Sequence, residues 1–203
     1  MALTALKSAV SSGCRLASGC VPSSLSWLPW SEFVVASEEP NYHEILNRLA
    51  DEGVEIIVVG MAAAVLQGVP VTTWDLDVVH RRTSENVERL LHVLRDLEAV
   101  ARHDPRRLRP NATHLIGPGH VLMETKFGDF DCLGAIDGGR SYEDLLGPSV
   151  LVDFEGCPLR LLSLREILAI KTRAGRPKDL AAIPYIQSTI DEIEQEGGGT
   201  AGP

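Results

Sequence analysis

The stretch from residue 72 to residue 80, TTWDLDVVH, limits most strongly what this chain can fold into. Its apolar and β-branched residues indicate a buried strand, yet Asp75 and Asp77 stand in the middle of it. Side chains two positions apart in a strand point to the same face, so the two carboxylates would lie side by side. Like charges at that separation repel each other unless a positive group lies between them. The stretch therefore predicts a strand with one apolar face and one face that favours a cation.

Two interpretations of this aspartate pair are open. Mg²⁺ prefers oxygen ligands and usually keeps positions for substrate phosphates, so Mg²⁺ or Mn²⁺ would supply the missing positive charge. Alternatively, the strand lies at the edge of a sheet and both carboxylates are solvated. The D-x-D spacing by itself favours the solvated edge.

Helical and strand patterns are mixed along the chain, which predicts an α/β (α+β) domain whose mixed sheet is flanked by helices. A hairpin is expected over 149–163 with its turn at Glu155-Gly156, and Pro184 should kink or shorten a final helix that begins at Pro177. Helices are expected over 41–53, 61–68, from Thr83 or Ser84 to about 97, and from Ser163 to about 172, and strands over 54–60, 72–80, 113–117, 120–127 and 129–136.

The first element with chemical potential is the turn at Gly60, between a predicted strand and a predicted helix. Such a turn directs free backbone N–H groups and the positive end of the helix dipole at whatever lies above it. A phosphate suits that place. Glycine turns are common in α/β proteins, so Gly60 alone is weak evidence for a phosphate site.

A second acidic pair, Asp129 and Asp131, lies in GDFDCLGAI at 128–136. A third carboxylate on a neighbouring strand would complete a two-metal site or act as general base on an attacking hydroxyl. Asp131 has the more apolar surroundings, so its burial needs a functional reason more than that of Asp129. We therefore predict Asp131 as the third carboxylate.

Cations gather near the end of the chain in LAIKTRAGRPKDL, although the net charge of the protein is −9. They could hold the β- and γ-phosphates or the leaving pyrophosphate, or they could be solvated at a helix end. The loop 102–109 carries four arginines and could meet an acidic acceptor or nothing at all. The late cluster comprises Lys171, Arg173, Arg176 and Lys178.

In this order, VVGMAAAVLQGVPVTTWDLDVV and GDFDCLGAI resemble the nucleotidyltransferase superfamily with the polymerase-β-like palm, over about residues 41 to 190. The pattern looks closest to the small bacterial branch of AbiEii-type toxins and related nucleotidyltransferases. That branch also carries a lysine followed by Arg-x-Lys-Asp, matched here by Lys171 and by RPKD at 176–179. The resemblance implies a palm-type mixed sheet with C-terminal helices.

The resemblance also implies a role for ten residues. Three carboxylates would hold Mg²⁺ or Mn²⁺ and carry catalysis, while the glycine turn, two hydroxyl residues and the late cations would bind nucleotide or phosphate. The carboxylates are Asp75, Asp77 and Asp131, and the nucleotide or phosphate ligands are Gly60, Met61, Thr72, Thr73, Lys171, Arg176 and Lys178.

The implied activity is transfer of a nucleoside monophosphate from a nucleoside triphosphate to a hydroxyl acceptor. The acceptor could be a tRNA, a protein or a small molecule, and the enzyme could be the toxin of a toxin–antitoxin pair with a cognate antitoxin. Relatives usually have a small residue where Met61 stands and often an arginine where Val71 stands. These departures motivate the alternative of a catalytically degenerate module that binds nucleotide or a partner protein.

Composition limits the class of protein. The chain has 203 residues and a net charge of −9, and this charge argues against a protein that coats nucleic acid non-specifically. No apolar run reaches 18 residues, which argues against a transmembrane helix. Its four cysteines show no metal-type spacing and are expected to be reduced in the cytoplasm. We expect residues 1–40 to be a disordered extension, 41–195 the nucleotidyltransferase-like domain and 196–203 a flexible tail.

Overall fold

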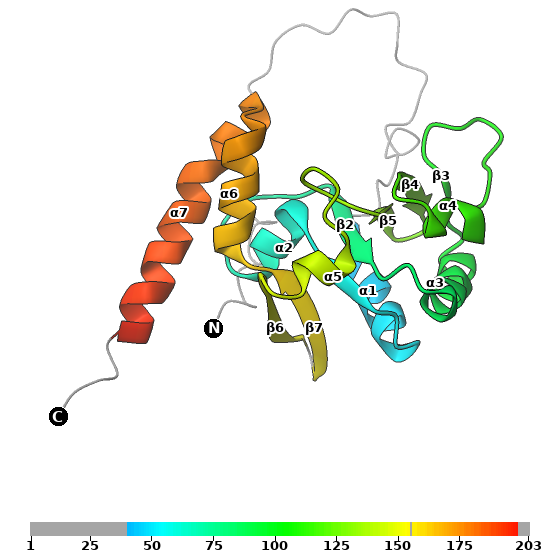
Figure 1. Ribbon diagram of the computed structural model, residues 1–203, viewed down its shortest axis with the longest axis horizontal. Coiled ribbons are helices and arrows are strands. Elements are labelled where there is room, and N and C mark those ends of the chain that lie inside the picture. Colours follow the sequence, from blue (N-terminus) through cyan, green and yellow to red (C-terminus); the bar gives the residue numbers. More distant parts are fainter. Residues whose placement is uncertain (1–39, 155, 199–203) are drawn as a thin grey trace, which may run out of the picture. The chain divides into compact units, whose positions relative to one another are not determined.

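The computed structural model describes residues 40–154 and 156–198. Within these ranges, seven strands form one mixed sheet in the order β3-β4-β5-β2-β1-β7-β6, with helices packed around it (Figure 1), which confirms the predicted fold class. The strands are β1 (Ile56–Val58), β2 (Asp75–His80), β3 (Val100–Ala101), β4 (His120–Thr125), β5 (Gly128–Leu133), β6 (Ser149–Phe154) and β7 (Cys157–Leu162). The helices are α1 (Tyr42–Asp51), α2 (Gly60–Leu66), α3 (Ser84–Asp96), α4 (Ala112–Ile116), α5 (Tyr142–Leu145), α6 (Leu164–Ala174) and α7 (Pro177–Gly198).

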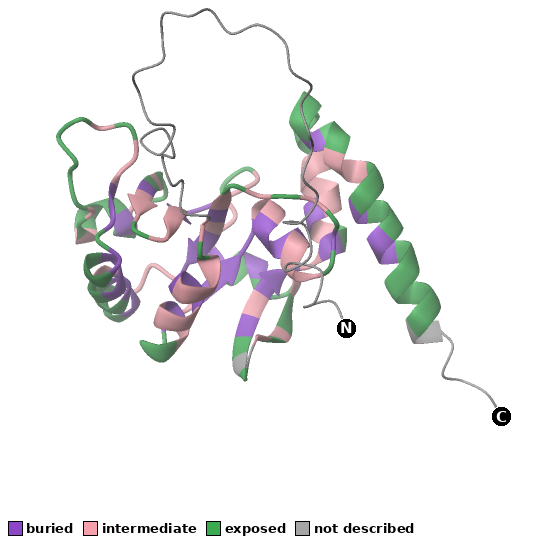
Figure 2. Ribbon diagram, turned by 180° about the vertical axis from the view of Figure 1, so that it is seen from behind, coloured by how far each residue is buried: buried purple, intermediate pink, exposed green. Residues whose placement is uncertain are grey.

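The centre of the sheet is formed by β5, β2 and β1. β1 pairs antiparallel with β2, and β2 pairs parallel with β5. The apolar side chains of these strands are buried, among them Ile57, Val78 and Phe130, and Figure 2 colours this region mainly purple. Because β2 and β5 run in the same direction, their acidic first halves lie next to each other.

Two amphipathic helices begin directly after polar residues that cap them. Asn41 accepts a hydrogen bond from the backbone N–H of Glu44 at 3.2 Å and caps α1. Thr83 caps α3 through the N–H of Asn86 at 3.3 Å. Such caps satisfy backbone donors that have no partner inside the helix. The apolar stripes of α1 and α3 face the core, which confirms both helix predictions.

The C-terminal helices form a pair. Gly175 ends α6 in the left-handed conformation, with φ +60°, and Pro177 begins α7. α7 continues through Pro184 to Gly198, so the prediction that Pro184 could end this helix early was wrong. Pro184 is exposed, so a carbonyl freed by its missing N–H can be hydrated. Figure 2 shows α7 mainly in green, because most of its surface is exposed.

Two further predictions for single elements have definite outcomes. The expected strand over 113–117 was wrong, because residues 112–116 form α4, which Asn111 caps through the N–H of His114 at 3.1 Å. β6 and β7 form the expected hairpin, with Phe154 opposite Cys157. Of its predicted turn, Glu155 lies outside the described residues.

The predicted domain limits lie close to the first and last described residues, 40 and 198. Residues 1–39 and 199–203 lie outside it, so the expected extension and most of the expected tail are not described. α7 includes residues 196–198 of that tail. No helix in the described ranges combines the length and apolar character needed to cross a membrane.

Candidate active site

Three carboxylates converge where β2 and β5 run side by side. In the parallel register of these strands, Asp75 lies opposite Asp129 and Asp77 lies opposite Asp131. Asp75, Asp77 and Asp131 each offer one carboxylate oxygen, and these oxygens all lie within 4.8 Å of one another. The structure thus brings together the three carboxylates that the sequence singles out.

The environment of two of these carboxylates, Asp77 and Asp131, disfavours their charge. Burial raises the pKa of Asp77 from 3.8 to about 6, and the charges of Asp75 and Asp131 add to the rise, while Arg102 and Lys178 oppose it. Burial also raises the pKa of Asp131, against the opposing effect of Arg102. Asp131 is only 4% exposed. Raised pKa values at Asp77 and Asp131, beside the third carboxylate, indicate a place that favours the binding of a cation.

Gly60 approaches Asp77 so closely that no side chain fits between them. A Cβ at position 60 would lie 2.6 Å from Asp77 Oδ2, and Gly60 has φ +64°, a conformation that other residues adopt at a cost. The N–H of Val59 also donates to the carbonyl of Asp77 at 2.9 Å. The predicted glycine turn therefore lies directly against the carboxylates. Met61, the departure next to it, packs its half-buried side chain against the core.

The two threonines before the first aspartate lie in different surroundings. The Thr73 hydroxyl lies 3.0 Å from the carbonyl oxygen of Asp75 and 3.2 Å from its Oδ1, so one proton serves two acceptors on one residue. This contact fixes the direction in which the Asp75 side chain enters the site. Thr72 is exposed.

An arginine whose role the sequence left open joins the site from the end of β3. Arg102 donates through Nη2 to Asp131 Oδ1 and to the carbonyl of Met123, the latter at 3.2 Å. Its Nε lies 3.2 Å from Asp129 Oδ2. Arg102 and Asp131 are separated by 29 residues, so no local pattern could have predicted their contact.

The cations of the late cluster have different surroundings: two pair with a buried carboxylate, and Lys178 lines the cleft without an ion pair among the described residues. Asp179, which is fully buried, accepts from Lys171 Nζ at 2.8 Å and from Arg176 Nε at 2.5 Å. Burial raises the pKa of Asp179, but these two hydrogen bonds outweigh it and hold the pKa below its usual value. Lys171 and Arg176 thereby join α6 to the beginning of α7. Lys178 forms no ion pair with any residue in the described ranges and lines the same cleft as the carboxylates.

A cleft of about 760 Å³ opens over the carboxylates. The sheet side contributes Gly60, Asp77 and Asp131, and the side formed by α6 and α7 contributes Lys171 and Lys178. The cleft therefore has an acidic wall and a basic wall. Such a pair of walls suits a ligand that carries a metal ion at one end of a polyphosphate.

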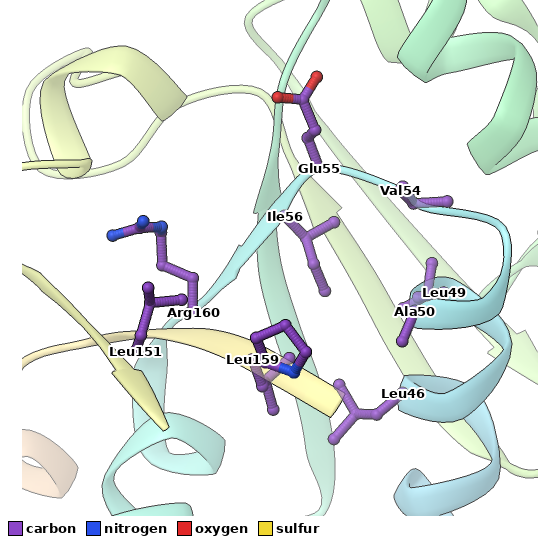
Figure 3. Close-up of a pocket in the computed structure, with 10 residues that line it drawn as sticks. Leu46, Leu49, Ala50, Val54, Glu55, Ile56, Leu151, Leu159 and Arg160 are labelled. Carbon is purple, nitrogen blue, oxygen red and sulfur yellow. The ribbon is translucent and has the colours of Figure 1, made fainter. Parts of the chain in front are cut away.

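A second hollow lies apart from these carboxylates, between α1, β1 and the β6–β7 hairpin (Figure 3). Its volume is about 310 Å³, and apolar side chains such as Leu46, Ile56 and Leu159 line it. The charged ends of Glu55 and Arg160 point away from these apolar groups in Figure 3. It offers no cluster of charged groups for catalysis.

The donor set at the carboxylates fits a hard divalent cation. All three candidate ligand atoms are carboxylate oxygens, which Mg²⁺ and Mn²⁺ prefer, and they lie within 4.8 Å of one another. Because Gly60 has no side chain, residue 60 places no side chain against the carboxylate of Asp77. Histidine and cysteine, which would favour Zn²⁺, contribute no ligand to this group.

Comparisons with known proteins relate the fold to nucleotidyltransferases. No family model matches the sequence, and no curated protein matches it. The crystal structure of the lincosamide antibiotic adenylyltransferase LnuA with bound lincomycin is similar, with a TM-score of 0.52 and 13% identity, over 73% of this chain and 95% of LnuA. The crystal structure of ANT(2")-Ia in complex with adenylyl-2"-tobramycin has a TM-score of 0.49 and 17% identity, over 75% of this chain and 90% of that one. The described domain thus has the fold of a nucleotidyltransferase.

Proposed function

We propose that this protein is a metal-dependent nucleotidyltransferase. The observation that carries the proposal is the convergence of Asp75, Asp77 and Asp131 within 4.8 Å of one another, beside the Gly60 turn, in a cleft with a basic opposite wall. The fold shared with LnuA supports it. Positioning and charge neutralisation account for most of the catalysis of phosphoryl and nucleotidyl transfer, and this cleft offers both.

In the proposed reaction, a hydroxyl oxygen of the acceptor forms a bond to the α-phosphorus of a nucleoside triphosphate. The bond from that phosphorus to the bridging oxygen breaks, and pyrophosphate leaves with the electron pair. Asp131 accepts the proton of the hydroxyl. Asp75 and Asp77 would hold Mg²⁺ or Mn²⁺ together with Asp131, and the cation would supply positive charge to the phosphates.

The remaining site residues would position the triphosphate. The backbone at Gly60 and Met61 can face its oxygens, and Thr73 keeps Asp75 in place. Lys178, which has no partner among the described residues, would face the β- and γ-phosphates. Lys171 and Arg176 would act through Asp179, since they hold the start of α7 and hence the position of Lys178.

The proposal extends to the acceptor and to the biological setting. Acceptors of three kinds are open: a tRNA, a protein side chain, or a small molecule such as the lincosamide on which LnuA acts by name. The resemblance to AbiEii-type toxins motivates a toxin with a cognate antitoxin. We place the protein in the cytoplasm, where nucleoside triphosphates and Mg²⁺ are abundant.

A transfer assay tests the proposal directly. Purified protein is mixed with Mg²⁺ or Mn²⁺, each of the four α-labelled nucleoside triphosphates, and in turn total tRNA, cell protein and a panel of hydroxylated small molecules. We expect label on one acceptor class, and a loss on the order of 10²-fold or more in Asp75→Asn. Asp96→Asn is the matched control, because it makes the same change at an exposed aspartate at the end of α3 that does not line the cleft.

The alternative function is a binding module without turnover. The bulky Met61 at the glycine turn is the observation that favours it, because phosphate needs close backbone approach there. Metal-dependent nucleotide binding without transfer to any acceptor would establish the module and contradict the enzyme. Transfer by the wild type that Asp75→Asn abolishes would exclude the module.

A further inference from the structure

Arg102 is built into the carboxylate site as a fixed cation. Its side chain is 14% exposed, and its guanidinium reaches Asp131 through Nη2 and lies 3.2 Å from Asp129 through Nε. The hydrogen bond from Nη2 to the Met123 carbonyl, at 3.2 Å, holds the group in this position. The backbone N–H of Arg102 donates to the carbonyl of Leu122 at 2.9 Å, which anchors the residue itself to β4.

The acidic residues of β5 and β2 differ in whether a cation of the protein contacts them. The pair on β5, Asp129 and Asp131, already has a protein cation in direct contact. The pair on β2, Asp75 and Asp77, forms no ion pair with any described residue. Like charges on one strand face need a positive neighbour. Arg102 provides this positive charge for the carboxylates of β5, whereas no described residue provides it for those of β2.

The oxygens of Asp131 are also divided. Oδ1 accepts from Arg102 Nη2 and from the backbone N–H of Met123, the latter at 3.3 Å. These two donors leave Oδ2 available to a ligand. Tyr42, another neighbour of this corner, brings no charge, since burial raises its pKa to about 12.

From these contacts we infer that Arg102 takes the place of a second metal ion, so that the nucleotide-free protein binds one divalent cation. That cation is held by Asp75, Asp77 and the remaining oxygen of Asp131. This inference rests on the proposed function, because it assumes that the carboxylates bind metal. Arg102 is a positioning residue in this scheme, since it acts on the site through Asp131.

Removal of the guanidinium charge should therefore create a site. In Arg102→Gln, the carboxylates of β5 lose their cation while an amide donor stays near Asp131. Two carboxylates on one strand face without a positive neighbour are then free to bind a second divalent cation. Arg102→Lys keeps the charge and should leave the number of bound cations unchanged.

The test counts Mn²⁺ bound to the full-length, nucleotide-free protein by the electron paramagnetic resonance signal of free Mn²⁺. The inference expects one Mn²⁺ per chain for the wild type and Arg102→Lys, and two for Arg102→Gln. Arg106→Gln is the matched control, because Arg106 lies in the same loop and pairs only with Asp104 among the described residues. It should bind one.

Each other count has a definite meaning. Two Mn²⁺ on the wild type, or one on Arg102→Gln, would overturn the inference and leave the proposed function standing. No Mn²⁺ on the wild type would contradict the metal-dependent function itself. If Arg102→Gln does not fold, circular dichroism during refolding replaces the count: Mn²⁺ should restore the folded spectrum, and failure to do so overturns the inference.

Discussion

At the scale of single residues, Asp77 carries a charge that the metal-free fold disfavours. Burial beside Asp75 and Asp131 raises its pKa from 3.8 to about 6. The unfolded chain therefore releases this proton at lower pH than the folded protein does. The contribution of Asp77 to stability is full below pH 3.8 and is lost as the pH rises through about 6.

We expect Asp77→Asn to be as stable as the wild type below about pH 4 and more stable at neutral pH, by up to roughly 3 kcal/mol. The measurement is urea unfolding in EDTA across this pH range. Asp129→Asn should show no such gain, because Asp129 is half-exposed and lies against Arg102. A gain that is the same at every pH would contradict the assignment to Asp77.

Gly60 is the second residue whose identity the site requires. In Gly60→Ala, the new Cβ would lie 2.6 Å from Asp77 Oδ2 and the residue would keep a positive φ. We expect a loss of roughly 1–3 kcal/mol in the free energy of unfolding. Displacement of the Asp77 carboxylate should lower transfer on the order of 10²-fold.

Gly147→Ala provides the comparison for Gly60→Ala. Gly147 has no neighbouring atom within 4 Å of a new Cβ and no positive φ, so alanine should leave both stability and transfer unchanged. Chemical denaturation and the transfer assay measure the two effects separately. Full transfer activity in Gly60→Ala would show that the close approach to Asp77 has no catalytic role.

At the scale of elements, the ion pairs of Asp179 join α6 and α7. Lys171, with a side chain 12% exposed, and Arg176, 62% exposed, share this buried carboxylate. We expect Lys171→Met to lower the free energy of unfolding by roughly 3 kcal/mol, since it breaks a buried pair. Arg176→Met should cost less than about 1 kcal/mol, since the Arg176 side chain is largely exposed and Lys171 still pairs with Asp179.

Hydrogen exchange distinguishes this element-level effect from general destabilisation. In Lys171→Met, the amides of the first turns of α7 should exchange faster, while those of β1 and β2 should change only with global stability. Equal losses in Lys171→Met and Arg176→Met would contradict the role assigned to burial.

The elements also show what sequence reasoning can and cannot reach. β1 was predictable because it lies in a continuous apolar run rich in β-branched residues, and β2 because its aspartates alternate with apolar residues. α1 and α3 were predictable because caps and apolar stripes are local signals. α4 was mistaken for a strand because five residues are too few to separate the two periods, although it follows Asn111, a residue type that commonly caps helices. β3, with two residues, has no pattern of its own.

The candidate site divides in the same way. The carboxylates could be predicted from the sequence because the D-x-D spacing and the apolar neighbours of Asp131 lie within short segments. The contact of Arg102 with Asp131 depends on how β3, β4 and β5 pair, which no segment encodes alone. The same holds for Lys178, whose place opposite the carboxylates depends on the packing of α7 against α6.

At the scale of the whole molecule, the cleft joins parts of the described domain that share few direct contacts. Its acidic wall belongs to the central strands, and its basic wall to α6 and α7. A ligand with a metal ion and a polyphosphate would contact both walls at once. Binding of such a ligand to the folded state alone adds RT ln(1 + [L]/Kd) to the free energy of unfolding.

We therefore expect Mg²⁺ together with a non-hydrolysable nucleoside triphosphate analogue to raise the Tm by roughly 5–10 °C at a ligand concentration of about 100 times Kd. Neither component alone should reach this shift, because each would contact only one wall. Asp75→Asn should lose the shift through the metal, and Lys178→Gln should lose part of it through the phosphates. A full shift with the analogue in EDTA would mean that the nucleotide binds without the carboxylates, and the proposed arrangement of the cleft would then be wrong.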